Sequence, residues 1–351
     1  MIQKELQYEM ERILPQERIL YNEPMDRHCS FRTGGPADAL AVVRTETELS
    51  SLLALLKARK EPFFLLGKGT NLLIGDGGCR GVIVTAAEAD QDKPGQGKTS
   101  GTAGTDRPGM KYSAGEHSGL TEPLTEANNV QQASFSLCDV RVEGNRVIAG
   151  AGATMKAAAL AAMEHGLSGL EFAAGIPGSV GGGLVMNAGA FGGEMRQVVQ
   201  SVRLLMPDGT VRDCGGQEME FGYRTSLLRR IPAVAMRAEF VLEPGDPAEI
   251  RAKIADLGER RRSKQPLAFP SAGSTFKRPE GYFAGKLIMD AGLAGYTVGG
   301  AQVSEKHCGF VINRGGATSA QIRMLIEDVQ KKVYEDAGVR LEPEVIFLGE
   351  F

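Results

Sequence analysis

The sequence EFAAGIPGSVGGGLVMNAGAFGGE, from Glu171 to Glu194, decides how this chain is built. Glycines occur throughout it, and its only charged residues are the two glutamates at its ends. Glycine lets a backbone turn tightly and approach a ligand closely, because no side chain stands in the way. Main-chain N–H groups in such turns bind phosphate oxygens without a lysine. The segment therefore favours a site for a dinucleotide.

A second segment of this kind lies upstream, LLGKGTNLLI from Leu65 to Ile74, where an apolar strand runs directly into a Gly-rich turn. It is not the Rossmann fingerprint, because Leu72 follows Gly67 and Gly69 where the third glycine belongs. Either segment alone is equally well explained as a tight turn. Together they favour a dinucleotide held by two loops outside a Rossmann crossover.

Strands and helices are predicted on both sides of these segments, from apolar runs, helical spacing, caps and turn dipeptides. The predicted elements are a helix within residues 1–20 that ends near Pro15, strands at 37–43, 63–67 and 81–84, helices at 45–60, 154–166, 247–262 and 318–338, hairpins turning at 144–145 and 208–209, and a final strand within 341–351. The first strand, helix and strand indicate a βαβ unit, and the whole is α+β without internal repeats.

Residues 86–132 have a different character. They are rich in Gly, Thr, Ser, Asp and Pro and lack an apolar period, which predicts a flexible surface insertion. Gly97-Lys98-Thr99 is similar to the end of a phosphate-binding loop. However, Asp92 occupies the place of the required first glycine and no strand precedes it, so we expect no nucleotide site there.

The composition argues against several classes of protein. The 351 residues carry a net charge of −3, so no global basic field attracts nucleic acid or an anionic membrane. The charged N-terminal stretch has neither a signal core nor a spanning segment. The five cysteines are scattered, without a CxxC pair or clustered histidines, which indicates free thiols and no metal site. We expect a cytoplasmic chain of two or three domains.

The two glycine segments and the motifs around them resemble a known family. GKGTNLLI and FAAGIPGSVGGGLVMNAGAFGGE are similar to the FAD-binding halves of the vanillyl-alcohol-oxidase type (PCMH) flavoproteins. The whole set resembles more closely the bacterial UDP-N-acetylenolpyruvoylglucosamine reductases, through CSFRTGGPADAL (29–40), FGYRTS (221–226), SAGSTFKRPEGYFAGKLIMDAGL (271–293), GAQVSEKHCGFVIN (300–313) and LEPEV (341–345). GSTFKRP followed by AGKLI resembles the shorter of two subtypes, which lacks a tyrosine-bearing loop over the substrate.

The resemblance implies a fold, cofactors and a substrate. The fold is α+β, with a two-lobed PCMH-type FAD-binding domain plus a separate α+β substrate-binding domain. Residues 1–85 and 341–351 would form the first FAD lobe, 86–245 the second lobe with the insertion, and 246–340 the substrate-binding domain. The cofactors are FAD and NADPH. The substrate is UDP-N-acetylglucosamine-enolpyruvate, reduced to UDP-N-acetylmuramate for peptidoglycan synthesis, and hence for cell wall biogenesis, cell shape and cell division.

The FAD is expected to be noncovalent, because neither glycine segment contains a His or Cys to which a flavin could be attached. The residues expected to bind it are Leu66, Gly67, Lys68, Gly69, Thr70, Asn71, Leu72, Gly175, Ile176, Pro177, Gly178, Ser179, Gly181, Gly182, Asn187 and Gly189.

Three further residues match the family's catalytic positions. Arg224 matches the arginine at the substrate carboxylate, a task that suits a permanently charged, bidentate guanidinium. Ser274 matches the proton donor. No histidine stands beside it in the sequence, which disfavours a hydrolytic serine nucleophile. Glu344 matches the third residue, which burial beside a carboxylate would keep protonated as a hydrogen-bond donor. Taken singly, each would be read as a salt-bridge, turn or surface residue.

The substrate also carries a diphosphate and a uridine, and polar or aromatic residues near the motifs are candidates to bind them. These are Tyr223, Lys277, Arg278, Lys286, Gln302 and His307.

Two other classes of function stay open at this point. Another PCMH-type flavoenzyme, acting on an alcohol or a 2-hydroxy acid, would need the glycine segments but not the FKRP, AGKLI, EKH and LEPEV motifs. A regulator with the same fold that binds a nucleotide sugar or a nucleotide would bind without turnover. Substrate-dependent consumption of NADPH separates the reductase from both. We expect a monomer with no nucleic-acid or membrane partner.

Overall fold

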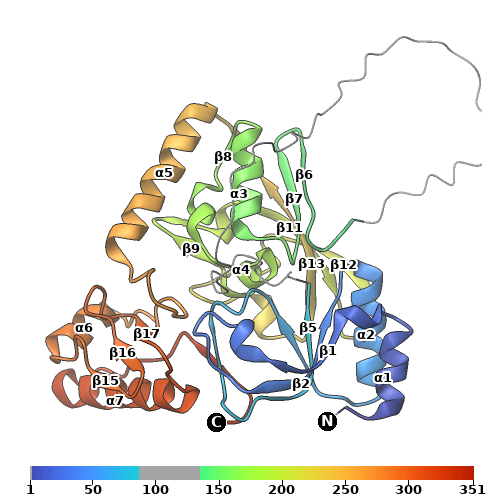
Figure 1. The fold of residues 1–351 in the computed structure, drawn as a ribbon. Coiled ribbons are helices and arrows are strands. Elements are labelled where there is room, and N and C mark those ends of the chain that lie inside the picture. Colours follow the sequence, from blue (N-terminus) through green and yellow to red (C-terminus); the bar gives the residue numbers. More distant parts are fainter. Residues whose placement is uncertain (1, 87–134) are drawn as a thin grey trace, which may run out of the picture. The chain divides into compact units, whose positions relative to one another are not determined.

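The N-terminal part of the chain folds around a four-stranded sheet in the order β1-β2-β5-β3 (Figure 1). The computed structural model describes residues 2–86 and 135–351, so the predicted insertion lies outside the described residues apart from Ala86. The elements are α1 (Lys4–Glu11), β1 (Ile19–Pro24), β2 (Pro36–Val42), α2 (Glu46–Ala58), β3 (Phe63–Leu66), β4 (Leu72–Ile74) and β5 (Cys79–Thr85). β2, β5 and β3 run parallel, which confirms the predicted βαβ unit, and β1 joins β2 antiparallel.

This sheet is apolar on both faces. Successive side chains of a strand point to opposite sides, so the consecutive apolar residues of β5 enter two different cores. Val82 and Val84 of β5 join the core that contains the buried leucines of α2. Ile83, between them, joins a different core that extends into the C-terminal helix α7 (Ser319–Ala337). The sheet therefore connects two hydrophobic cores.

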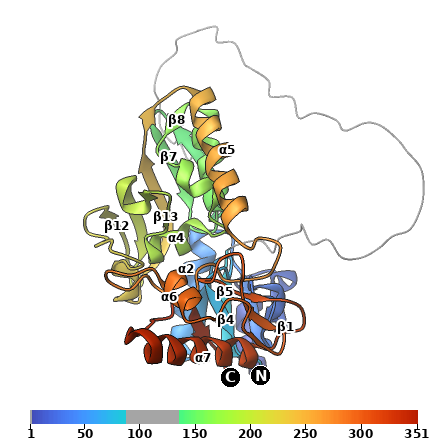
Figure 2. The same cartoon turned by 90° about the vertical axis from the view of Figure 1, so that its left-hand side faces the viewer.

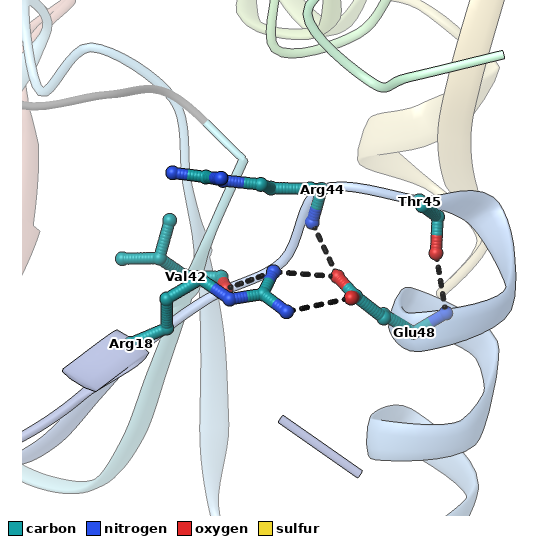
Figure 3. Close-up of polar contacts among 5 residues, drawn as sticks. All are labelled: Arg18, Val42, Arg44, Thr45 and Glu48. Carbon is teal, nitrogen blue, oxygen red and sulfur yellow. Dashed lines mark hydrogen bonds and ion pairs between the residues drawn. The ribbon is translucent and has the colours of Figure 1, made fainter. Parts of the chain in front are cut away.

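Glu48 links the start of α2 to the segment that precedes β1 (Figure 3). Arg18 donates to both carboxylate oxygens of Glu48, at 2.8 and 2.7 Å, and the main-chain N–H of Arg44 donates at 2.7 Å. Thr45 caps the helix as predicted, since its hydroxyl accepts from the N–H of Glu48 at 3.1 Å. The paired guanidinium lowers the pKa of the Glu48 carboxyl.

The middle part contains a five-stranded antiparallel sheet in the order β12-β11-β13-β7-β6. Both predicted hairpins are confirmed, and α5 lies beside α3 and leads to the C-terminal part (Figures 1 and 2). The elements are β6 (Val140–Glu143), β7 (Arg146–Gly150), α3 (Met155–Glu164), β8 (Leu167–Ser168), η3 (Glu171–Gly175), α4 (Val180–Met186), β9 (Gly189–Ala190), β10 (Gly193–Glu194), β11 (Val199–Leu205), β12 (Val211–Gly215), β13 (Val234–Val241), β14 (Glu243–Pro244) and α5 (Pro247–Lys264).

The C-terminal part packs α7 along a three-stranded antiparallel sheet, β15-β16-β17 (Figure 1). α7 is bounded as predicted, by the capping hydroxyl of Thr318 and by Gly338 in a left-handed conformation. The final strand is shorter than predicted, because residues just before it pair with the chain near Phe276 instead. The elements are α6 (Ala284–Asp290), β15 (Thr297–Val298), β16 (Ala301–Val303), β17 (Val311–Asn313), α7 and β18 (Ile346–Leu348).

The chain returns to its beginning, because β18 pairs in parallel with β4 of the N-terminal part. The described residues form one compact unit by their contacts. Within residues 2–86 and 135–351, no helix is both long and apolar enough to cross a membrane. The chain is α+β as predicted, while the proposed limits of its domains stay a prediction.

Candidate active site

The two glycine segments, far apart in the sequence, face each other in the structure. A Cβ placed on Gly67 would lie 2.5 Å from the hydroxyl oxygen of Ser179, so no larger residue fits there without displacement. A Cβ on Gly178 would lie 3.8 Å from Oγ1 of Thr70. The Ser179 hydroxyl also accepts from the N–H of Gly182 at 3.2 Å. The segments therefore form one cradle, bounded largely by main chain and small side chains.

The first glycine turn is fixed against the N-terminal motif CSFRTGG. Gly69 has a φ of +63°, and a Cβ on it would lie 1.9 Å from the carbonyl oxygen of His28. The N–H of Ser30 donates to the carbonyl of Gly69 at 3.0 Å. The hydroxyl of Ser30 is buried and has no hydrogen-bond partner within the described chain. Such an orphaned group beside a ligand loop is typical of a site that a ligand completes.

Arg224 stands in a tight turn of the middle part. Gly222 and Thr225 close this turn with two main-chain hydrogen bonds, at 3.0 and 3.4 Å. Arg224 itself has a φ of +54°, a left-handed conformation that is unusual for an arginine and marks a constrained position. Its Nε lies 2.8 Å from Oε1 of Glu344, which comes from the C-terminal tail. The structure thus brings two of the three predicted catalytic residues into contact.

Glu344 connects its contact with Arg224 to the first glycine segment. The amide of Asn71 donates to the carbonyl oxygen of Glu344 at 3.0 Å, and the N–H of Ile346 donates to the carbonyl of Asn71 at 3.0 Å. Burial raises the pKa of the Glu344 carboxyl above its ordinary value, and the nearby Arg224 and Lys277 oppose that rise only in part. A glutamate in such surroundings keeps its proton more readily than one in water.

Ser274 precedes a short stretch of chain that is clamped from two sides. The N–H of Thr275 donates to Gly309, and the carbonyl of Thr275 accepts from the N–H of Glu344, both at 2.8 Å. Phe276 then pairs with Pro343. Ser274 is exposed, and its hydroxyl makes no hydrogen bond within the part of the chain that the structure describes. The clamp therefore carries Ser274 to the neighbourhood of Glu344 with its hydroxyl available to a ligand.

The comparisons with known proteins agree with this geometry. The family model "FAD binding domain" matches residues 129–215, and "UDP-N-acetylenolpyruvoylglucosamine reductase, C-terminal domain" matches residues 265–348. The UDP-N-acetylenolpyruvoylglucosamine reductase of Caldanaerobacter subterraneus is 45% identical over 341 residues, which cover 97% of each chain. This chain belongs to the UDP-N-acetylenolpyruvoylglucosamine reductase family.

Other members of the family support the same assignment. The reductase of Clostridioides difficile is 42% identical over 338 residues, with 96% of each chain covered. The crystal structure of the Thermus caldophilus reductase is 27% identical and superposes with a TM-score of 0.67, covering 94% of this chain and 98% of that one. The predicted fold class, a two-lobed PCMH-type FAD-binding domain plus an α+β substrate-binding domain, is confirmed by this likeness.

The matched FAD-binding domain makes FAD the cofactor to test against the two glycine segments, and an arginine missed by the sequence analysis supports the fit. Arg261 of α5 is half-buried and has no acidic partner among the described residues, so burial lowers its pKa. A Cβ on Gly175 would lie 3.7 Å from Nη1 of Arg261. A half-buried guanidinium without an acidic partner among the described residues, placed beside an anion-binding loop, suits a pyrophosphate.

The residues around Arg261 in the sequence indicate that its side chain points inward. Arg260 and Arg262 pair on the helix surface with Asp256 and Glu259, four and three residues earlier. Arg261 has Leu257 and Gly258 at the same spacings and therefore no local partner. Within a run of three arginines, the one without a helical partner is the one that faces inward.

The other predicted FAD residues are placed along the same two segments. Leu66 ends β3 and Leu72 begins β4, and both side chains are buried in the core, so a cofactor would meet their main chain. The cofactor contact predicted for Asn187 would likewise come from its main chain, because both amide N–H groups are used within the protein. The remaining residues lie in the first turn (Lys68), at the end of η3 and after it (Gly175, Ile176, Pro177), in α4 (Gly181) or in β9 (Gly189).

Three predicted substrate residues gather beside Arg224 and Glu344. The hydroxyl of Tyr223 accepts from the N–H of Arg278 at 3.0 Å, which joins the middle part to the C-terminal part. The guanidinium of Arg278 lies over the ring of Phe283 at 3.9 Å. Lys277 pairs with the exposed Glu342. This exposed set of cations and aromatic rings is suited to a diphosphate and an attached base.

Lys286 lies in α6, and His307 lies beside the same helix at Gly285. Lys286 is exposed and pairs with Asp290 at 2.8 Å. The ring of His307 packs edge-on against Phe310, and its Cε1 would be 3.5 Å from a Cβ on Gly285. Burial lowers the pKa of His307, so its imidazole favours the neutral form. Nothing in these contacts brings either side chain to Arg224.

Gln302 lies apart from the Arg224–Glu344 pair. Its amide donates to the carbonyl of Gly295 and to the hydroxyl of Thr297, at 3.3 and 3.2 Å. It lines a hollow that none of the three predicted catalytic residues borders, formed by Pro266, Leu267, Ala268, Phe269, Gln302, Ser304, Glu305, Lys306, Ile312 and Arg314. No group of His, Cys, Asp and Glu within residues 2–86 and 135–351 is arranged to hold a metal ion.

Proposed function

We propose that this chain catalyses the FAD-dependent, NADPH-driven reduction of UDP-N-acetylglucosamine-enolpyruvate to UDP-N-acetylmuramate, for peptidoglycan precursor synthesis. The observation that supports it most is the contact of Arg224 with Glu344, which is itself joined through Asn71 to the first glycine segment. A flavin oxidase of alcohols has no need for a guanidinium and a glutamate carboxyl placed together beside the cofactor loop. The family relationship points to the same reaction.

The glycine segments and Arg261 would hold FAD, which supplies the hydride that it takes from NADPH. Backbone N–H groups of the facing turns would meet the pyrophosphate, and the half-buried guanidinium of Arg261 would neutralise it.

Arg224 and Glu344 would act on the substrate carboxylate. Nε of Arg224 faces Glu344, and no hydrogen bond of the described residues uses its terminal N–H groups, which are left for the carboxylate. Negative charge grows on this carboxylate when hydride adds to the neighbouring double bond. A fixed guanidinium stabilises that charge, and a protonated Glu344 would donate a further hydrogen bond to it.

Ser274 would give the proton that completes the reduction. Its hydroxyl is exposed and not engaged within the described chain, while the clamp around Thr275 fixes its main chain. A serine is a weak acid, so it serves only against a strongly basic carbon held in contact. The charged carbon that remains after hydride addition is such an acceptor.

The proposal includes the cellular setting. NADPH and nucleotide sugars are found in the cytoplasm, and the five cysteines are all free thiols. We propose a cytoplasmic monomer whose product feeds cell wall growth, and thereby cell shape and division. Scattering or sedimentation of the holoenzyme at micromolar concentration would test the monomer.

Loss of the proton from Glu344 should slow the reaction at high pH. Above its raised pKa the carboxyl has nothing to donate, so kcat/KM for the enolpyruvyl substrate should fall as the pH rises through that value. Glu344→Gln keeps an N–H donor without titrating, so its profile should lose this alkaline limb. The measurement is NADPH consumption across pH in both proteins. An alkaline limb unchanged in the variant would assign it to another group.

Removing the guanidinium of Arg261 should weaken FAD binding by about 10–100-fold, since a hydrogen bond to a charged group contributes about 1.5–3 kcal/mol. Arg261→Met replaces it with a side chain of similar length, and Arg262→Met is the matched control on the solvent side. Flavin fluorescence during titration of the apoprotein gives the affinity.

The stability of the apoprotein supplies an independent measurement for Arg261. Because a half-buried charge without an acidic partner is costly, Arg261→Met apoprotein should melt at or above the wild-type temperature while its holoprotein melts lower. A variant with wild-type FAD affinity would contradict the assigned role.

The proposed reaction is tested by following flavin absorbance without oxygen. NADPH should bleach the bound flavin, and UDP-N-acetylglucosamine-enolpyruvate should then restore its colour with formation of UDP-N-acetylmuramate. Restoration by oxygen but not by this substrate would favour an oxidase. A purified protein without flavin, or with flavin that NADPH does not bleach, would favour a binding protein and overturn the proposal.

A further inference from the structure

The turn that carries Arg224 is held by a buried asparagine from the second glycine segment. The amide nitrogen of Asn187 donates to the carbonyl of Gly222 and to a carboxylate oxygen of Glu194, both at 3.0 Å. Its amide oxygen accepts from the N–H of Arg196 at 3.0 Å. The side chain is 2% exposed, so both donors and its acceptor are used inside the protein.

We propose that Asn187 is a positioning residue, which fixes Arg224 for reduction of the substrate by holding the Gly222–Thr225 turn against the flavin segment. The inference rests on the role proposed for Arg224. It assigns to the side chain of Asn187 a task in the transfer of hydride to substrate, and leaves the FAD contact predicted for this residue to its main chain.

The turn depends on outside support. Of its two main-chain bonds, the one from Thr225 to Gly222 is long, at 3.4 Å, whereas Asn187 reaches the same carbonyl at 3.0 Å. The hydroxyl of Ser226 donates to the carbonyl of Val185 at 3.1 Å, which anchors the exit of the turn to the same helix end. The turn is therefore attached at both sides to the C-terminal end of α4.

The support matters because Arg224 occupies a constrained conformation. With a φ of +54° it needs its neighbours held in place, since a relaxed turn would return it to the ordinary right-handed or extended regions. A displacement of about 1 Å at a catalytic group costs about 100-fold in rate. The hydrogen bond from Asn187 to Gly222 thus affects catalysis by orienting the Arg224 guanidinium, with which Asn187 makes no direct contact.

The backbone of Asn187 allows its side chain to be tested by itself. Asn187 caps α4 in a left-handed conformation, with φ of +41°, which glycine adopts without strain. Asn187→Gly therefore removes the amide and keeps the helix end. Asn22 is exposed and has a φ of +52° in β1, so Asn22→Gly is the same substitution away from the site and serves as the control.

We expect Asn187→Gly to bind FAD and to be reduced by NADPH within about twofold of wild type, and to reoxidise with substrate about 10–100-fold more slowly. The double variant Asn187→Gly/Arg224→Ala should be no slower than Arg224→Ala alone, because the asparagine acts only through the arginine. The experiment is anaerobic stopped-flow absorbance of the flavin in each holoenzyme, with melting temperatures measured in parallel.

A purely structural role gives a different pattern. It would slow both half-reactions alike and add fully to the Arg224→Ala effect, and that outcome would overturn the inference. A lower melting temperature is expected in either case, because three hydrogen bonds of a buried side chain are lost. If Arg224→Ala slows reoxidation and Asn187→Gly does not, the inference fails while the proposed role of Arg224 stands. If Arg224→Ala leaves reoxidation unchanged, the proposed function itself loses its support.

Discussion

Ser274→Ala should leave reduction of the flavin by NADPH unchanged and slow the reduction of UDP-N-acetylglucosamine-enolpyruvate by a factor of about 10²–10⁴. The serine is exposed, and its hydroxyl makes no hydrogen bond within the described chain, so its removal disturbs no contact that holds the fold. The proton for the substrate carbon would then have to come from water, which is not held in position. Stopped-flow absorbance of the flavin, first with NADPH and then with substrate, separates the two phases.

A cysteine at this position provides a second measurement. Its thiol is more acidic than the serine hydroxyl and nearly the same size, so Ser274→Cys should recover part of the rate that Ser274→Ala loses. Ser263→Ala, on the solvent side of α5, should match wild type in both phases. Equal rates in the alanine and wild-type proteins would show that the proton comes from elsewhere.

Elements with local signals were predictable from the sequence. The helices α2 and α7 are framed by capping threonines and, for α7, by a glycine in the left-handed conformation, and these features act within a few residues. β1 was missed because its strand character comes from its partner β2, which lies beyond a loop that contains the Cys29–Gly35 motif. The predicted final strand is longer than β18 because the N–H of Glu344 donates to the carbonyl of Thr275 and does not pair with β4.

In the candidate site, too, residues within local motifs were predictable and contacts between distant segments were not. Arg224, Ser274 and Glu344 were assigned through motifs that resemble a family, and their roles stay predictions until the variants are measured. What the sequence could not supply is the contact between Arg224 and Glu344, because it depends on how the C-terminal tail returns to the N-terminal part. For the same reason Gln302, which lies near the motifs in sequence, borders a different hollow in space.

Arg224→Ala should lower kcat for the enolpyruvyl substrate by a factor of about 10²–10³, as expected when one preorganised donor to a developing anion is removed. The same change leaves Glu344 buried without its cation, so the pKa of that carboxyl should rise and the alkaline limb of the pH profile should move to higher pH. Steady-state NADPH consumption across pH measures both effects in one series.

Arg224→Lys distinguishes charge from geometry. An ammonium ion keeps the positive charge but not the planar fork of donors, so its kcat should fall between those of wild type and the alanine variant. Arg230, which is exposed and pairs with Glu220, provides the control, and Arg230→Ala should match wild type. The reduction of flavin by NADPH does not involve the substrate carboxylate. Its rate should therefore be equal in wild type, Arg224→Ala, Arg224→Lys and Arg230→Ala. A variant that slows both phases equally would place Arg224 in flavin binding and not at the substrate.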